Sequence, residues 1–245
     1  MRSESSLGTY NESSTRLLVS ILKGTRNGPI DVQWIARNTP LLMAVAKKKL
    51  NELHKARLIT LEGEHVTIST HQRIGLAVEA LKCGLDPETV SRYLRWQEFE
   101  ELTKLALEAN QYMTLKHLHF SHMNHRWEID VVGLKEPIIL SIDCKHWKRG
   151  WQRAAIMTLV EEHIERTEAF SNVALYMKAK LPIYRWLGAK AIPVIITLHE
   201  APFNLYKRVP VVPVLKLANF LNELPANLDT LKIIRIKVNK DEIQS

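Results

Sequence analysis

Three ionisable residues stand close to the ends of two strand-like runs near the middle of the chain. The segment 127–147, WEIDVVGLKEPIILSIDCKHW, carries Asp130 in the first run and Asp143 and Lys145 in the second. Because side chains two positions apart in a strand share a face, Asp143 and Lys145 should emerge side by side. The short turn at residues 134–137 predicts a hairpin, which would bring Asp130 within reach of Asp143.

Two carboxylates beside one lysine are costly to bury unless they bind something. A hard divalent cation such as Mg²⁺ or Mn²⁺ would supply the missing positive charge, since Mg²⁺ binds through one or two carboxylates, retained waters and substrate phosphate oxygens. Such an ion lowers the pKa of bound water and stabilises charge on phosphate. The lysine can orient the attacking water or neutralise the transition state. The pattern therefore predicts metal ligands at Asp130 and Asp143 and a catalytic cation at Lys145.

The elements that must hold these residues begin near residue 86. Asp86-Pro87-Glu88 combines an acidic cap with proline at the first helical position, which predicts a helix that continues to about residue 110. Strand-like runs then alternate with helices: YMTLKHLHF, EIDVVG and IILSIDCK precede a long helix over about 151–180, and the strand IPVIITL and a final helix–strand pair follow. This alternation predicts an α/β (α+β) domain over 86–245.

The part before residue 86 follows a different pattern. Residues 1–13 are polar and are expected to form a flexible tail. Residues 14–85 then predict the order helix, helix, helix, hairpin, helix, with Asp31 as a cap of the second helix and Pro40 in the first turn of a third helix over about 39–57. This order resembles a winged helix-turn-helix domain.

The resemblance to a winged helix implies that the third helix reads DNA and that the hairpin is the wing. Five basic residues on or after that helix are then expected to contact phosphates. They are Lys47, Lys48, Lys49, Lys55 and Arg57. A lysine run on an amphipathic helix is equally typical of a solvated face, and winged helices also serve protein contacts, so both alternatives stay open.

An acid followed, after a hairpin, by an acid-x-lysine triplet resembles the PD-(D/E)XK nuclease superfamily, which includes restriction enzymes and Holliday-junction resolvases. The segment WQEFEEL resembles the helix that supplies an N-terminal acid in Mrr-like restriction endonucleases, which makes Glu100 a third acid. The resemblance covers about residues 96–205 and implies a restriction endonuclease-like mixed sheet flanked by helices. The sequence departs from the pattern of this superfamily in two places. Residue 129 is isoleucine rather than proline, and SHMNHRW stands where Mrr-like enzymes have a glycine-rich segment.

Several residues near the hairpin are secondary candidates. His125 ends a histidine group with His117, His119 and His122, for which solvated loop positions are favoured over a zinc site. Glu128 shares the face of Asp130. The segment HWKRGWQR follows Lys145 and mixes aromatic with basic residues, which suits backbone grip and base stacking. Lys148 and Arg149 of this segment are candidates for DNA contact, and Gln152 is a candidate auxiliary group. The alternative is that the tryptophans of this segment pack inward and that it has no role at the substrate.

The composition fits this interpretation. The formal net charge is +8 and the pI about 9.4, which suits a polyanionic partner but occurs in many proteins that bind no nucleic acid. No apolar run approaches the roughly 18–20 residues of a membrane span, and the two cysteines match no zinc or disulfide spacing, so a cytoplasmic protein is expected. The sequence predicts a DNA endonuclease, with homodimerisation plausible. Alternatives are a non-catalytic DNA-binding or regulatory protein on the same fold, or an RNA-processing nuclease.

Overall fold

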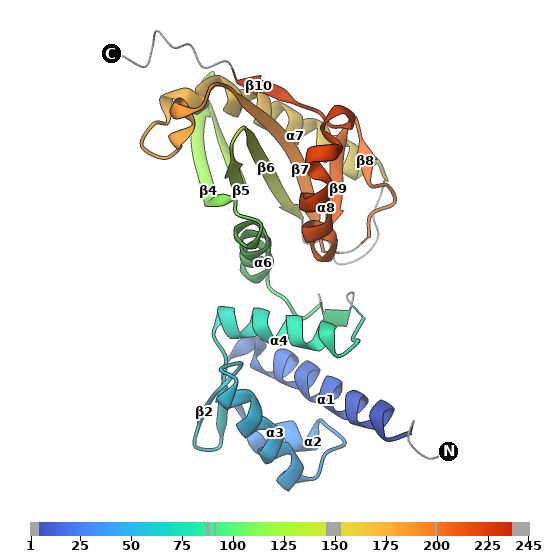
Figure 1. Ribbon diagram of the computed structural model, residues 1–245. Coiled ribbons are helices and arrows are strands. Elements are labelled where there is room, and N and C mark those ends of the chain that lie inside the picture. Colours follow the sequence, from blue (N-terminus) through green and yellow to red (C-terminus); the bar gives the residue numbers. More distant parts are fainter. Residues whose placement is uncertain (1–4, 87–88, 91, 146–152, 199, 237–245) are drawn as a thin grey trace. The chain divides into compact units, whose positions relative to one another are not determined.

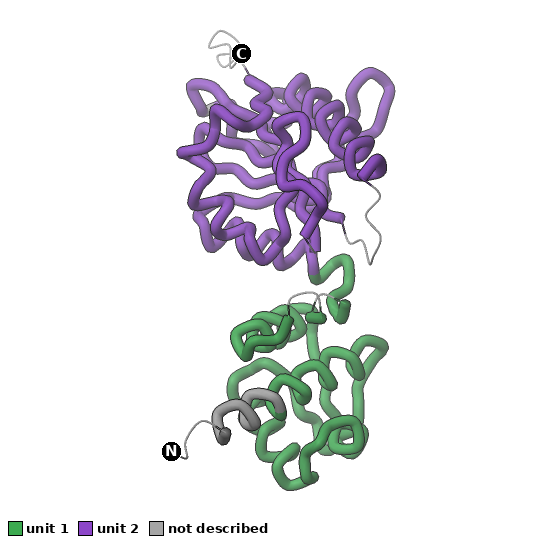
Figure 2. Tube along the Cα trace, turned by 90° about the vertical axis from the view of Figure 1, so that its right-hand side faces the viewer, with its two compact units in different colours: residues 1–98 green, residues 99–245 purple. Residues whose placement is uncertain are grey.

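The computed structural model describes residues 5–86, 89–90, 92–145, 153–198 and 200–236 (Figure 1). The chain divides into two compact units, residues 1–98 and residues 99–245 (Figure 2). This boundary lies later than the predicted one between residues 85 and 86. The reason is packing: the guanidinium of Arg73 is buried in the first unit, where its Nε lies 2.6 Å from Glu98 Oε1 and it donates to the carbonyl of Tyr93 at 2.7 Å.

The first unit contains helices around a small antiparallel sheet of strand order β1-β3-β2. Its elements in chain order are α1 (Ser5–Gly24), η1 (Thr25–Asn27), β1 (Ile30–Asp31), α2 (Val32–Arg37), α3 (Met43–Lys55), β2 (Thr60–Glu62), β3 (His65–Thr67) and α4 (Thr70–Lys82). Asp31 caps α2 as predicted, by accepting from the backbone N–H of Gln33. A capping box of Ser69 and Gln72 begins α4.

Three predictions for the first 110 residues are wrong in detail. Residues 5–13, expected to belong to a tail, are helical instead, because α1 begins at Ser5. The third helix begins at Met43 rather than near residue 39, so Leu42 and Val45 lie exposed at its start instead of on its apolar side. Asp86 caps a helical turn as predicted, by accepting from the backbone N–H of Thr89 at 2.9 Å, but the helix does not continue to residue 110, because residues 92–95 are not helical. A turn precedes α6 (Trp96–Ala109), whose Glu98 accepts from the backbone N–H of Arg95.

The second unit is built on a mixed sheet, which confirms the predicted α+β class of a mixed sheet flanked by helices. Its strand order is β4-β5-β6-β7-β9-β8, with β10 paired to β7. The elements after α6 are β4 (Met113–His122), β5 (His125–Lys135), β6 (Ile138–Lys145), α7 (Arg153–Val173), η2 (Ala174–Tyr176), η3 (Pro182–Arg185), β7 (Ala189–Thr197), β8 (Leu205–Tyr206), β9 (Val209–Pro213), η4 (Val214–Lys216), α8 (Leu217–Glu223), η5 (Leu224–Ala226), η6 (Leu228–Thr230) and β10 (Ile234–Ile236).

Two layers of helix cover the strand that carries the predicted triplet. β4, β5 and β6 form an antiparallel meander, and β6 connects through α7 to the parallel strand β7 (Figure 1). On β6, Ser141 hydrogen-bonds Thr167 of α7 at 3.0 Å, whereas the thiol of Cys144 lies 3.8 Å from Thr103 of α6. Alternation along β6 therefore directs the face with Ser141 and Asp143 toward α7 and the face with Cys144 toward α6.

A hydrophobic core of the second unit lies between the sheet and α7. Phe120 of β4 and Phe170 of α7 meet edge to face at 5.8 Å, among buried aliphatic residues of β5, β6 and β7. Within the described residues, no helix combines the length and the apolar character needed to cross a membrane.

Candidate active site

Asp130 and Asp143 face each other where β5 and β6 separate. The last paired residues of these antiparallel strands are Val131 and Ile142, so the next position in register sets Asp130 opposite Asp143. Instead of continuing the ladder, the backbone N–H of Cys144 donates to Asp130 Oδ2 at 2.7 Å. One carboxylate oxygen thus replaces a strand carbonyl and fixes Asp130 against the end of β6.

Asp143 is almost fully buried and is compensated by two cations. Lys145 Nζ lies 2.9 Å from its Oδ2, and the guanidinium of Arg166, on α7, pairs with its Oδ1. Burial by itself would raise the pKa of Asp143, but electrostatic interactions with His163 and with the cations Lys145 and Arg166 outweigh it, so the pKa falls below its ordinary value. Asp143 is therefore held as a carboxylate.

Asp130 has weaker compensation, from the charge of Lys145 and one backbone N–H. Burial, reinforced by the charges of Asp143 and Glu100, raises its pKa from 3.8 to about 6, although the hydrogen bond from Cys144 opposes the shift. Two carboxylates at adjacent positions therefore differ: one is neutralised by neighbouring cations, and the other retains an excess of negative charge. Perturbed acids of this kind gather at functional sites, although structural networks also produce them.

Glu100 reaches the same region from α6. Its side chain is 1% exposed, and its Oε2 lies 3.3 Å from Nε2 of His117, without the alignment of a hydrogen bond. The other ring nitrogen of His117 lies 3.0 Å from Glu128 Oε1. His117 occurs within β4 at the register position opposite Asp130, and its φ of 52° is in the left-handed region that non-glycine residues seldom adopt. This conformation places the imidazole between two acids.

An open cleft of about 460 Å³ is lined by the acids and cations of this site. It is lined by His125, Arg126, Trp127, Glu128, Asp130, Asp143, Lys145, Glu162, Glu165 and Arg166. Asp130, Asp143, Lys145, Glu128 and His125 are thus brought together as expected, while Glu100 lies buried beside them. The prediction of loop positions for the histidines is wrong, because His117, His119 and His122 lie in β4 and His125 in β5.

The donor set suits a hard cation better than a structural transition metal. In the described part of the chain, no three His, Cys, Asp or Glu side chains form a group that would hold a metal ion by themselves. Mg²⁺ does not require such a group, since it keeps several waters and uses one or two carboxylates. The less compensated Asp130 carboxyl, and the Oε2 of Glu100 without a hydrogen bond, are the oxygens that fit such an ion.

The remaining predicted residues lie elsewhere. Lys148, Arg149 and Gln152 fall outside the described residues. In the first unit, the five basic candidates on or just after α3 are at least partly exposed. Lys47 pairs with Glu64 of the hairpin turn at 2.7 Å, and Lys49 donates to Ser14 at 2.7 Å.

Arg166 and His163 were not identified from the sequence, and His117 was considered there only as one of a group of solvated loop histidines. His163 is fully buried in α7, where it contacts the carbonyl of Ser141 at 2.8 Å, and burial lowers its pKa to about 4. Arg166 stands three residues later, on the neighbouring part of the same helix. The sequence does not predict that Arg166 contacts Asp143, because this contact depends on how α7 packs against β6.

Comparisons with known proteins give a family without an activity. No family model matches the chain. An uncharacterized protein of Archaeoglobus fulgidus is 30% identical over 132 residues, which are 54% of this chain and 92% of that protein. The chain belongs to the family of this archaeal protein. Protein VC1899 from Vibrio cholerae, a crystal structure, aligns with a TM-score of 0.37 and 13% identity over 92% of this chain and 52% of its own, so this chain spans about half the length of VC1899.

Proposed function

We propose that this protein is a metal-dependent nuclease that hydrolyses phosphodiester bonds in DNA. The observation that carries the proposal is the pair of carboxylates, Asp130 and Asp143, placed opposite each other at a separating strand end, with Lys145 at 2.9 Å from Asp143 in an open cleft. The element order α6-β4-β5-β6-α7-β7 agrees with the resemblance to PD-(D/E)XK nucleases. A binding protein has no need for this cluster of acids beside a lysine.

Asp130, Asp143 and Glu100 would hold Mg²⁺ or Mn²⁺. When bound, the ion would lower the pKa of a bound water and stabilise negative charge on the phosphate. Lys145 donates hydrogen bonds to a nonbridging phosphate oxygen or to the attacking water, and so stabilises the charge that develops. Arg166 has the same charge on the opposite side of Asp143, and its planar guanidinium suits a phosphate. The peptide N–H of Cys144 holds Asp130 in its orientation.

The winged-helix-like unit would supply the grip on DNA. Its exposed α3 lysines and Arg57 suit the phosphate backbone, and binding through such groups depends strongly on salt. DNA binding by the first unit can be tested separately from cleavage, because the basic residues of α3 and the acids of the candidate active site lie in different units.

Cleavage is tested with purified protein and three substrates: duplex, single-stranded and branched DNA. Each is incubated with Mg²⁺, with Mn²⁺ or with a chelator. We expect metal-dependent cleavage of at least one DNA, loss of that cleavage in Asp143→Asn, and full activity in Asp229→Asn, which changes an exposed acid of the same unit. Undiminished cleavage by Asp143→Asn would refute the site. Cleavage of an RNA counterpart in preference to all three DNAs would move the substrate class to RNA.

A second function has one specific observation in its favour. Both oxygens of Asp143 are engaged, one by Lys145 and the other by Arg166, so the carboxylate is already neutralised within the protein. A nuclease fold that binds DNA without cutting it would have this arrangement. Folded protein that binds DNA but cleaves no nucleic acid with either ion would establish that alternative.

A further inference from the structure

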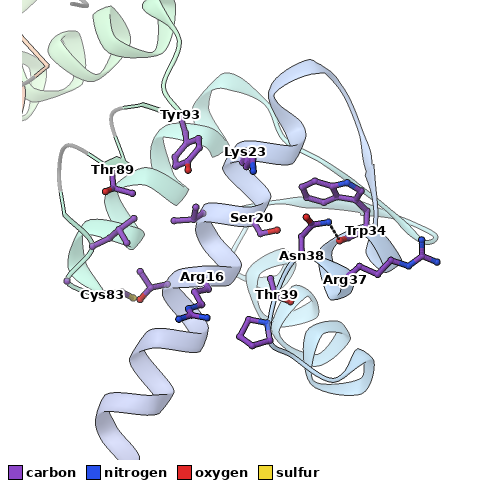
Figure 3. A pocket seen from close by; sticks show the side chains of 15 residues that line it. Arg16, Ser20, Lys23, Trp34, Arg37, Asn38, Thr39, Cys83, Thr89 and Tyr93 are labelled. Carbon is purple, nitrogen blue, oxygen red and sulfur yellow. Dashed lines mark hydrogen bonds between the residues drawn. The ribbon is translucent and has the colours of Figure 1, made fainter. Parts of the chain in front are cut away.

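A pocket of about 850 Å³ lies within the first unit. Its volume is within the range of about 300–1,000 Å³ typical of small-molecule sites. Figure 3 shows α1 along its floor, with Trp34, Arg37 and Asn38 on the α2 side and Cys83 and Thr89 on the other. All of its lining residues belong to this unit, so the pocket is complete without the rest of the chain.

The charge around this pocket has one sign. Arg16 and Lys23 of α1 and Arg37 of α2 contribute cations, and among the described residues that line the pocket there is no aspartate or glutamate. Cations gathered along one pocket favour an anionic ligand. Arginine adds a planar pair of donors that suits phosphate oxygens.

A buried hydroxyl points to a ligand in the same place. Ser20 is 6% exposed, and its Oγ has no hydrogen-bond partner in the described structure. Its side chain extends from α1 toward the side of the pocket that carries Trp34 and Asn38 (Figure 3). A buried hydroxyl without a partner costs free energy, so a ligand oxygen that reaches Ser20 would recover it.

Aromatic rings complete the lining. The six-membered ring of Trp34 is held against α1, because a Cβ added at Gly24 would come within 2.6 Å of it. Tyr93 provides a second ring at the other side of α1 (Figure 3). Indole and phenol faces stack on nucleobases of any sequence. Cations for phosphate, a hydroxyl and a flat apolar face together describe the parts of a nucleotide.

We propose that this pocket binds a nucleotide, with its phosphates on Arg16, Lys23 and Arg37, an oxygen on Ser20 and its base against Trp34. The nucleotide is either free or part of a single strand, since both present the same phosphate and base. This site is distinct from the α3 surface and does not depend on the cleavage chemistry proposed for the second unit.

Binding is measured by calorimetry on the full chain with a chelator present, so that no divalent ion carries phosphate to the acidic cleft. The probes are ATP, a single-stranded tetranucleotide and inorganic phosphate. Ser20→Ala removes only the unpaired hydroxyl and should preserve the fold. Arg37→Ala removes an exposed cation, and Lys82→Ala is the matched control outside the pocket. We expect Arg37→Ala and Ser20→Ala each to weaken nucleotide binding about tenfold, as loss of a hydrogen bond to a charged group does, and Lys82→Ala to leave it unchanged.

Alkylation of Cys83 provides an independent measurement of whether a ligand occupies the pocket. Of its two cysteines, Cys83 lines the pocket whereas Cys144 is fully buried, so a thiol-alkylating reagent reports on Cys83 in the folded protein. ATP or the tetranucleotide should slow this alkylation in the wild type and less so in Arg37→Ala. Tighter binding of ATP identifies a free nucleotide as ligand, and tighter binding of the tetranucleotide identifies a strand. Equal binding of inorganic phosphate, insensitivity to both variants, or alkylation unchanged by either nucleotide overturns the proposal.

Discussion

The two opposed carboxylates of the candidate active site have different surroundings, and their variants should therefore differ. Asp143 has two cationic partners, while Asp130 relies on one peptide N–H and lies near Asp143 and Glu100. Removing the charge of Asp143 leaves the cationic side chains of Lys145 and Arg166 close together, where they repel each other. Removing charge from Asp130 relieves repulsion instead.

Asp130→Asn should stabilise the metal-free protein near neutral pH. The unfolded chain holds this carboxyl at a pKa of 3.8 and the folded chain at about 6, so its contribution to stability is present below 3.8 and is lost as pH rises through 6. The shift corresponds to at most about 3 kcal/mol, which the variant should recover in part at pH 7. Chemical denaturation at pH 7 and pH 4, with a chelator, measures the difference.

At pH 4 the advantage of Asp130→Asn should disappear, because the wild-type carboxyl is then protonated. His163, whose lowered pKa makes acid destabilising, is common to both proteins and cancels in the comparison. A stability gain that is equal at both pH values would show that the variant acts through packing rather than through charge.

Lys145→Ala should separate metal binding from catalysis. The lysine is proposed to act on the substrate and contributes no metal ligand, so the affinity for Mn²⁺ should stay nearly unchanged while the single-turnover cleavage rate falls about 10²-fold or more. Lys135→Ala, at the other end of the β5–β6 hairpin, is the control and should cleave normally. Equal loss of rate in both variants would contradict a catalytic role for Lys145.

Among the elements, α3 decides whether the first unit grips DNA. Replacing Lys47, Lys48 and Lys49 together by alanine should weaken DNA binding about equally for all sequences and reduce the slope of log affinity against log salt by up to about 3. Lys47 and Lys49 must first leave Glu64 and Ser14, which lowers their share. Fluorescence anisotropy over a salt series measures both quantities.

The start of α3 favours the alternative that this helix contacts a protein rather than DNA. Leu42, Met43 and Val45 are exposed there, with Leu42 at 78%. Apolar residues at this end suit a protein contact better than base edges. Unchanged DNA affinity and salt slope in the triple lysine variant would assign α3 to such a contact.

The elements show what the sequence can predict. The β5–β6 hairpin follows from alternation and a short turn, and Ile138–Lys145 forms the strand whose faces alternation assigns correctly. The helix start near residues 39–42 and the break at residues 92–95 were predicted wrongly, because tertiary contacts such as that of Glu98 with Arg73 override local signals. Arg166 could not be placed on Asp143, since its position depends on how α7 packs against β6.

For the whole molecule, the boundary between the units makes a sharp prediction about fragments. Residues 1–98 should fold with a cooperative thermal transition, whereas residues 1–85 should not. The shorter fragment lacks Glu98 and leaves Arg73, 2% exposed, without its carboxylate. Breaking a buried ion pair in this way costs about 3–5 kcal/mol. Circular dichroism melts compare the two.

The ion pair itself can be isolated in the full chain. Glu98→Leu should destabilise the first unit strongly, and adding Arg73→Met should restore much of the loss, because two apolar side chains replace a pair whose desolvation is costly. A double variant as unstable as the single one would mean that Arg73 acts through its hydrogen bonds to Leu22, Thr25 and Tyr93.

The left-handed backbone at His117 also bears on how the molecules behave in concentrated solution. β4 is the first strand in the order of the large sheet, so one of its edges carries backbone groups that a strand of another molecule could pair with. A φ of 52° in the middle of this ten-residue strand breaks the regular row of donors and acceptors. The irregularity therefore protects the sheet against edge-to-edge aggregation, and a β-branched residue at position 117 would favour fibrils.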